Sequence, residues 1–208
     1  NKLERYVGKT AILGLGYGMG AEKFQYTLKT GAPSIDVNIG TARAIVSQYR
    51  GTYPNIPGLW RVGKQLLFGM MDRTQTGNIY GPLTISNNAL RLPNGMYLKY
   101  PNLRYVNGEF LYFSGRFKGP IRTHGPRLVE NIIQALARIV ITDQILDIQN
   151  LQALDVVLTV HDEVVCQGLD DKPDETLASI ISIMKKAPIW CKELPLNAEG
   201  NYSKLYAK

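Results

Sequence analysis

Four side chains near the start of the chain are spaced as one face of a helix. Arg5, Lys9, Leu13 and Tyr17 lie four residues apart, so on an α-helix they form a single, slowly drifting stripe. Two cations followed by an apolar and an aromatic residue suit a ligand that is anionic at one end and flat at the other, such as a nucleoside triphosphate. Taken alone, the stripe favours a plainer alternative, a solvated basic face on which Leu13 and Tyr17 contact the core.

Two adjacent carboxylates form a second candidate. Asp162 and Glu163 follow His161 between two valine-rich runs, Val156–Val160 and Val164–Gln167, which predict a hairpin with acids at its tip. Carboxylate oxygens are the ligands that Mg²⁺ prefers, and His161 would lie beside the metal. Because adjacent side chains of a strand point to opposite faces, we expect one of the two acids to contact the metal directly. An ordinary solvated turn is the alternative.

A predicted basic loop from 116 to 127, punctuated by Gly and Pro, is the third candidate. Its cations include Arg122 and Arg127, which would suit a phosphate backbone or could simply be solvated. The helix predicted after it carries Asn131 and Gln134 near its start. Amides at such positions can read minor-groove acceptors or satisfy buried polar groups, and for this helix capping and solvation are the simpler interpretation.

Composition narrows the class of protein. The chain has 208 residues, of which 45% are hydrophobic and 20% charged, as is ordinary for a globular protein of one or two domains. Two cysteines exclude a disulfide framework and suit a reducing, cytoplasmic location. No apolar stretch approaches the roughly 20 residues of a membrane span, so we expect no membrane contact. The net charge of +7 favours an anionic partner, most often nucleic acid.

The elements that must position these residues can be predicted from periodicity and turn signals. Residues 1–30 have a helical pattern crowded by glycines, which indicates either a surface approached closely by another backbone or ligand, or an early helix end near Gly18 to Gly20. Asn94-Gly95 and Asn107-Gly108 predict two hairpins with type I′ turns. We further predict helices at 41–49 (capped by Thr41), 59–71, 128–146 and 175–186, and a turn-rich break at 51–57. This order predicts an α+β fold with an antiparallel sheet.

Together, these residues resemble the C-terminal part of a family A DNA polymerase of the phage-like kind. The segment from Arg5 to Gly18 resembles motif B on the fingers helix, and Val160–Val164 resembles motif C on the palm hairpin. Leu128–Ala135 resembles the intervening helix of phage-type members, and the segment from Leu194 to Gly200 resembles the end of such polymerases.

The resemblance implies a helical fingers region at 1–80, containing the motif B helix, followed by a palm region at 81–208 with an antiparallel sheet, packed helices and the motif C hairpin. It implies a template-directed DNA polymerase of replication or repair that adds deoxynucleotides to a primer 3′-hydroxyl by two-metal nucleotidyl transfer. Mg²⁺ would be the cofactor, and primer–template DNA and deoxynucleoside triphosphates would be the partners, in the cytoplasm of a bacterium or phage-infected host.

The resemblance also implies residue roles. Arg5 and Lys9 would bind the triphosphate, with Lys9 the proton donor to the leaving pyrophosphate; Leu13 would lie against the sugar, and Tyr17 would stack near the templating position. Asp162 would be catalytic and bind the metals, with Glu163 beside it. The implied DNA contacts are Asn131, Gln134, His161, Arg122 and Arg127.

Three departures from the family pattern matter. Leu13 stands where many members have an aromatic residue, and Glu130 stands where cellular members often have Asn. Motif A, which precedes motif B and supplies the other metal-binding Asp, is not in these 208 residues, so we expect a fragment that lacks the N-terminal part of its parent and is inactive alone.

The alternative is a stand-alone nucleic-acid-binding module with a degenerate polymerase scaffold and no catalysis. A metal-dependent nuclease is less favoured, because it needs more clustered carboxylates.

Overall fold

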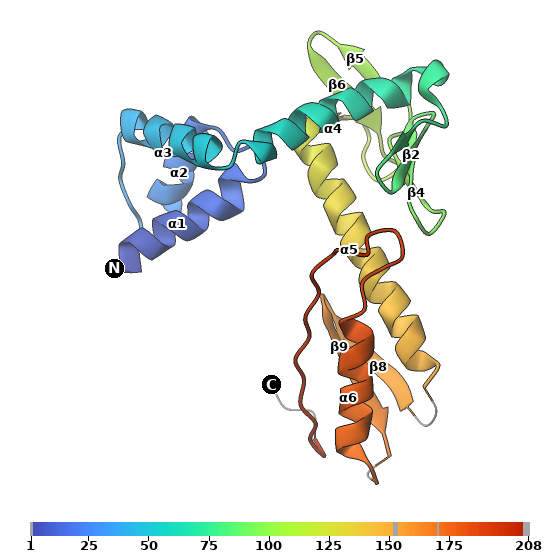
Figure 1. Ribbon diagram of the computed structural model, residues 1–208. Helices are drawn as coiled ribbons and strands as arrows, with labels where there is room; N and C mark the ends of the chain where they lie inside the picture. Colours follow the sequence, from blue (N-terminus) through green and yellow to red (C-terminus); the bar gives the residue numbers. More distant parts are fainter. Residues whose placement is uncertain (1, 152–153, 170, 206–208) are drawn as a thin grey trace. The chain divides into compact units, whose positions relative to one another are not determined.

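The computed structural model describes residues 2–151, 154–169 and 171–205 (Figure 1). Asn1, where the predicted N-terminal helix was expected to begin, lies outside the described residues. The α-helices are α1 (Lys2–Leu15), α2 (Ala21–Thr30), α3 (Ile39–Thr52), α4 (Asn55–Met71), α5 (Gly125–Gln149) and α6 (Pro173–Met184), with a short 3₁₀ helix at Arg73–Gln75. No helix among these residues is long and apolar enough to cross a membrane.

The strands form three antiparallel sheets. One contains β1 (Ile79–Tyr80), β2 (Leu83–Ser86), β3 (Ala89–Arg91) and β4 (Tyr97–Lys99); the second contains β5 (Arg104–Val106), β6 (Glu109–Phe113) and β7 (Pro120–Thr123); the third is the hairpin of β8 (Leu154–Val160) and β9 (Glu163–Gly168). The prediction of an α+β fold with antiparallel rather than doubly wound strands is therefore confirmed.

The chain divides into two compact units. The first contains Asn1–Arg91 and Tyr97–Ile133, and the second contains Leu92–Met96 and Gln134–Lys208. This division does not coincide with the predicted boundary between fingers and palm at residue 80, which is a functional boundary and stays a prediction.

The first three helices pack around a core of their own. Ala11 and Leu15 of α1, Phe24 and Leu28 of α2, and Ala42 and Val46 of α3 are all buried there. Each pair is four residues apart, so each helix turns one narrow apolar face inward. The chain leaves α1 in a turn that ends at Gly18, whose φ of +84° is a conformation that glycine adopts without steric cost. An early helix end, one of the two predicted alternatives, is confirmed, although α1 ends at Leu15, before the predicted Gly18 to Gly20.

The connection from α3 to α4 is shorter than predicted. Asn38, not Thr41, caps α3, because its Oδ1 accepts the backbone N–H of Thr41 at 2.8 Å. The break predicted at 51–57 is wrong in extent, since α3 continues to Thr52 and α4 begins at Asn55. Pro57 lies in the first turn of α4, where a missing N–H removes no helical hydrogen bond, so it does not break the helix.

The two Asn-Gly turns differ. Asn107 and Gly108 both have positive φ, as a type I′ turn requires, and they join β5 to β6. At Asn94-Gly95 only the glycine has positive φ, so the predicted type I′ turn is wrong. There, Asn94 Oδ1 accepts the N–H of Met96 at 3.1 Å, which stabilises a wider connection between β3 and β4.

The prediction that the basic segment 116–127 is one loop is wrong. The segment contains β7, which pairs with β6, and α5 begins at Gly125, three residues before the predicted start. Strand β7 gave no clear sequence signal because only Thr123 of its four residues is buried. Strands β1 and β2 were also not predicted, and both residues of β1 are exposed.

Within the second unit, the C-terminal half of α5 is tied to the end of α6. Gln144 is buried, and its Nε2 donates to the carbonyl oxygen of Met184 at 2.9 Å. Asp147 of α5 and Lys186, just after α6, also form an ion pair at 3.6 Å. Gln149 near the end of α5 accepts the backbone N–H of Val156 at 3.1 Å, so the helix also holds the start of β8.

Candidate functional site

The cation stripe lies on the exposed face of α1. Arg5, Lys9 and Leu13 are exposed, whereas Ala11 and Leu15 on the other face are buried. Leu13 is 58% exposed, so the alternative that places it in the core is wrong. Among the described residues, no ion pair involves Arg5 or Lys9. The face therefore offers two uncompensated cations and a bare apolar side chain.

Tyr17 does not continue this face by helical geometry. Helix α1 ends at Leu15, and the N–H of Tyr17 donates to the carbonyl of Gly14 at 3.1 Å in the turn that follows. The ring is 53% exposed, so Tyr17 is not a core residue either. The next residue, Gly18, lies close to Pro126 in the first turn of α5: a Cβ on Gly18 would stand 2.9 Å from the Pro126 ring. The turn that carries Tyr17 is thus held against the start of α5.

The acidic hairpin is present, with a tighter tip than predicted. Val160 pairs with Glu163, so the turn consists of His161 and Asp162 alone and Glu163 is the first residue of β9. His161 has φ +54°, which is uncommon for a residue other than glycine. The three residues of the tip are exposed, and an irregularity in register lies between Val156 and Leu158. Strained turns of this kind often occur at functional sites.

The hairpin tip carries two side chains of the type that a magnesium site uses. Asp162 and Glu163 place two carboxylates next to each other in the sequence, which are oxygen donors of the kind that Mg²⁺ takes. Within the residues that the structure describes, no group of three or more His, Cys, Asp or Glu side chains could hold a metal ion. The donor chemistry thus fits a divalent cation, but further oxygen ligands must complete its shell.

The predicted DNA contacts from 122 to 131 are engaged within the protein. Arg122 pairs with Glu109 at 3.0 Å and Arg127 pairs with Glu130 at 3.0 Å. Asn131 Nδ2 donates to the hydroxyl of Tyr100 at 2.7 Å.

Tyr100, which receives the Asn131 bond, is only 2% exposed, and its burial raises the pKa of its hydroxyl to about 12. The amide of Asn131 therefore supports the fold whatever else it contacts.

The predicted site residues fall into the two compact units. The stripe on α1 lies in the first unit, with Arg122, Arg127 and Asn131, while the exposed Gln134 lies in the second with the hairpin tip of His161, Asp162 and Glu163. Each group is therefore described within its own unit, and the roles assigned to these residues stay predictions.

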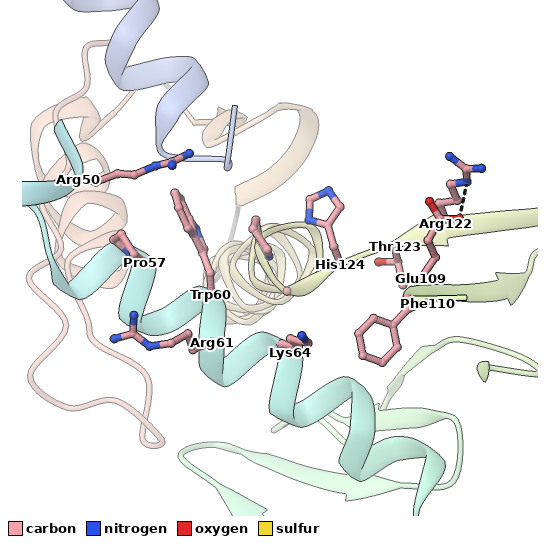
Figure 2. A pocket seen from close by; sticks show the side chains of 13 residues that line it. Arg50, Pro57, Trp60, Arg61, Lys64, Glu109, Phe110, Arg122, Thr123 and His124 are labelled. Atoms are coloured by element: carbon pink, nitrogen blue, oxygen red, sulfur yellow. Dashed lines mark ion pairs between the residues drawn. The ribbon is translucent and has the colours of Figure 1, made fainter. Parts of the chain in front are cut away.

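The first unit also contains a cavity of about 600 Å³ that the sequence did not reveal. It is lined by the end of α3, one side of α4, the start of β6, the end of β7 and the first turn of α5 (Figure 2). Trp60 and Lys64 are four residues apart on α4, a spacing that could have drawn attention to this helix. Arg50 and Thr123 join them only because the fold brings distant segments together.

Comparison with known proteins gives one informative similarity. The chain is 29% identical over 219 residues to a DNA polymerase of Bacillus phage SP02, in an alignment that covers 98% of this chain. The chain spans 33% of the length of that polymerase. No protein-family model and no solved structure matches the chain. The resemblance to a phage DNA polymerase is thereby confirmed over nearly the whole chain.

Proposed function

We propose that this chain is the C-terminal part of a family A DNA polymerase, with α1 as the motif B helix of the fingers and the β8–β9 hairpin as motif C of the palm. The observation that carries the proposal is the similarity to a phage DNA polymerase over 98% of the chain, which includes both segments. The exposed cations of α1 and the exposed acids of the hairpin tip are in keeping with it.

In this proposal the face of α1 receives the incoming nucleotide. Arg5 and Lys9 would hold the triphosphate oxygens, because neither has an ion pair among the described residues that binding would break. Lys9 Nζ would give its proton to an oxygen of the leaving pyrophosphate. Leu13 would lie against the sugar, and Tyr17 in the following turn would stack near the templating base.

The hairpin would hold the metals. Asp162 and Glu163 would present carboxylate oxygens to Mg²⁺, and the ions when bound would lower the charge of the triphosphate and activate the primer 3′-hydroxyl. His161, at the strained first position of the turn, would contact the primer strand, and Gln134 the DNA near the insertion site. Asn131, Arg122 and Arg127 would contact DNA at the start of α5 and at β7.

We further propose that the 208 residues do not polymerise by themselves. The described residues hold no group of three or more potential metal-binding side chains, whereas two-metal transfer needs additional carboxylates. The remainder of a longer polymerase, with a second metal-binding Asp, would be the natural partner. The purified chain should therefore fail to extend a primer; extension that is lost in Asp162→Ala would overturn this part of the proposal and support the rest.

Nucleotide binding tests the assignment of α1. The chain should bind a deoxynucleoside triphosphate, and Arg5→Ala and Lys9→Ala should each weaken binding, whereas Lys23→Ala on the exposed side of α2 removes a similar charge and should not. Equal losses in all three variants would contradict the assignment.

The rival function is a nucleic-acid-binding module without catalysis, which the basic cavity of the first unit favours because its cations need no metal. The coding sequence upstream of Asn1 separates the two. An Asp-bearing strand followed by a helix would support the polymerase, and a start codon directly before Asn1 would support the module.

A further inference from the structure

The cavity of the first unit carries an excess of positive charge. Arg50, Arg61, Lys64 and Arg122 line it, with Glu109 as the acidic side chain among them. Arg122 Nε and Glu109 Oε2 are 3.0 Å apart and neutralise each other, as the dashed line in Figure 2 marks. Within the described part of the chain, no ion pair involves the other three cations. A ligand for this cavity should therefore be an anion.

Two polar atoms in the cavity wall have no hydrogen-bond partner among the residues that the structure describes. These are Thr123 Oγ1 and Arg50 Nε. Thr123 is only 5% exposed, and Arg50 uses another nitrogen, Nη2, to donate to the carbonyl of Met19 at 3.3 Å. Buried polar atoms without a partner are rare and cost free energy. Both atoms can donate a hydrogen bond, so an oxygen of a bound anion would satisfy them.

The cavity also offers a flat surface. Trp60 lines it, with the guanidinium carbon of Arg50 5.7 Å from the centre of its ring. In Figure 2, the Trp60 ring and the His124 imidazole both lie above the ribbon of α4. His124 Nδ1 accepts the N–H of Arg127 at 3.4 Å, which leaves Nε2 as the donor of the neutral ring. Aromatic rings beside cations are the usual means by which proteins stack unpaired bases.

From these observations we infer that the cavity binds a nucleotide with an unpaired base, its phosphate at the cations and Thr123 and its base against Trp60. The cavity volume of about 600 Å³ suits a small-molecule-sized group. An acidic peptide would satisfy the charge but would leave the aromatic surface unused. The nucleotide can belong to a single strand or be free, and in either case this site is separate from the stripe on α1 and does not depend on polymerase activity.

Trp60 provides the readout. The chain has two tryptophans, so Trp190→Phe leaves Trp60 as the reporter. A single-stranded oligothymidylate added at low salt should quench the Trp60 fluorescence, with an affinity that falls as salt rises. Thymidine monophosphate in a second titration separates the sources: a strand that binds at least tenfold more tightly than the free nucleotide assigns the site to a strand, and equal affinities assign it to free nucleotides.

Charge-matched variants locate the site. Arg61→Ala with Lys64→Ala should weaken binding about tenfold, because both cations line the cavity. Arg91→Ala with Lys99→Ala removes the same charge from the exposed side chains of β3 and β4, outside the cavity, and should change affinity less than twofold. The proposal is overturned by absence of quenching, by equal losses in the two double variants, or by polyglutamate that displaces the oligonucleotide at equal charge.

Thr123→Val separates a binding role from a structural one. The substitution keeps the shape of the side chain and removes a hydroxyl that has no hydrogen-bond partner in the described part of the chain, so the melting temperature should be unchanged or higher. Affinity for the oligonucleotide should nevertheless fall about threefold. A lower melting temperature with unchanged affinity would show that the hydroxyl serves the fold and would overturn its role in binding.

Discussion

Helix α1 and the β8–β9 hairpin both carry their predicted chemistry on exposed side chains, but they differ in what supports them. Helix α1 buries Ala11 and Leu15 against α2 and α3. In the hairpin, Leu154 is the buried residue among those described in the two strands, while Val157 and Leu158 remain 55% and 45% exposed.

The difference shows how separable function and stability are in the two regions. On α1, the packing face and the charged face are opposite each other, so the residues proposed to be functional can change without loss of the core. A hairpin of two strands is marginally stable without further strands or a helix to cover it. In the proposed polymerase, the remainder of the palm would cover the exposed apolar side chains of β8.

The largest effect should come from the packing face of α1. Leu15→Ala should lower the free energy of unfolding by about 2–5 kcal/mol, since Leu15 is fully buried. Leu13→Ala on the exposed face should change it by less than about 0.5 kcal/mol. Urea unfolding followed by circular dichroism measures both, and similar losses in the two variants would refute the separation of the faces.

Alkaline pH should also distinguish the regions, since the first unit holds a buried tyrosine and the hairpin tip is exposed. The pKa of Tyr100 is raised from 10.0 to about 12 by burial. Between these values the unfolded chain loses the proton and the folded chain keeps it, so stability present below pH 10 is lost as pH rises to 12. The loss should be about 3 kcal/mol.

Unfolding at pH 9 and pH 11.5 measures the alkaline effect on the first unit. Tyr100→Phe serves as the control, because it removes this titration while the other tyrosines remain. A pH dependence that is the same in the variant would show that Tyr100 is not its source.

Nucleotide binding should respond to the exposed face of α1 with an intermediate effect. Arg5→Ala or Lys9→Ala should each weaken binding of a deoxynucleoside triphosphate about tenfold, or roughly 1.4 kcal/mol, by loss of a charge-assisted contact. The melting temperature should stay unchanged, because neither side chain packs against the core. A variant that lowers both the melting temperature and the affinity would show that the charged face of α1 is not separate from its packing face.

The smallest effect should be at the hairpin tip when this chain is studied alone. Asp162→Asn should weaken binding of Mn²⁺, a spectroscopic substitute for Mg²⁺, by a few-fold, because two carboxylates form only part of a metal shell. Asp171→Asn removes another exposed carboxylate, outside the hairpin tip, and should leave the Mn²⁺ relaxation signal unchanged. Equal effects would indicate non-specific binding.

Much of the local structure was predictable because its causes are local. The Asn107-Gly108 turn followed from the need for positive φ, and the end of α1 followed from its crowded glycines. The same reasoning was wrong at Asn94, where a side-chain bond to Met96 stabilises a different turn. It also missed β7, because a mostly exposed strand shows no apolar alternation.

The sequence by itself determined the helices, the acidic hairpin and the order of the two candidate motifs, since helical spacing, turn residues and adjacent carboxylates depend on near neighbours in the chain. Only the tertiary structure decided which side chains are free to act. It exposed Leu13, engaged Asn131 with Tyr100, and joined Arg50, Trp60 and Thr123 around one cavity. Burial and hydrogen-bond satisfaction depend on segments far apart in sequence, and local patterns carry no record of those partners.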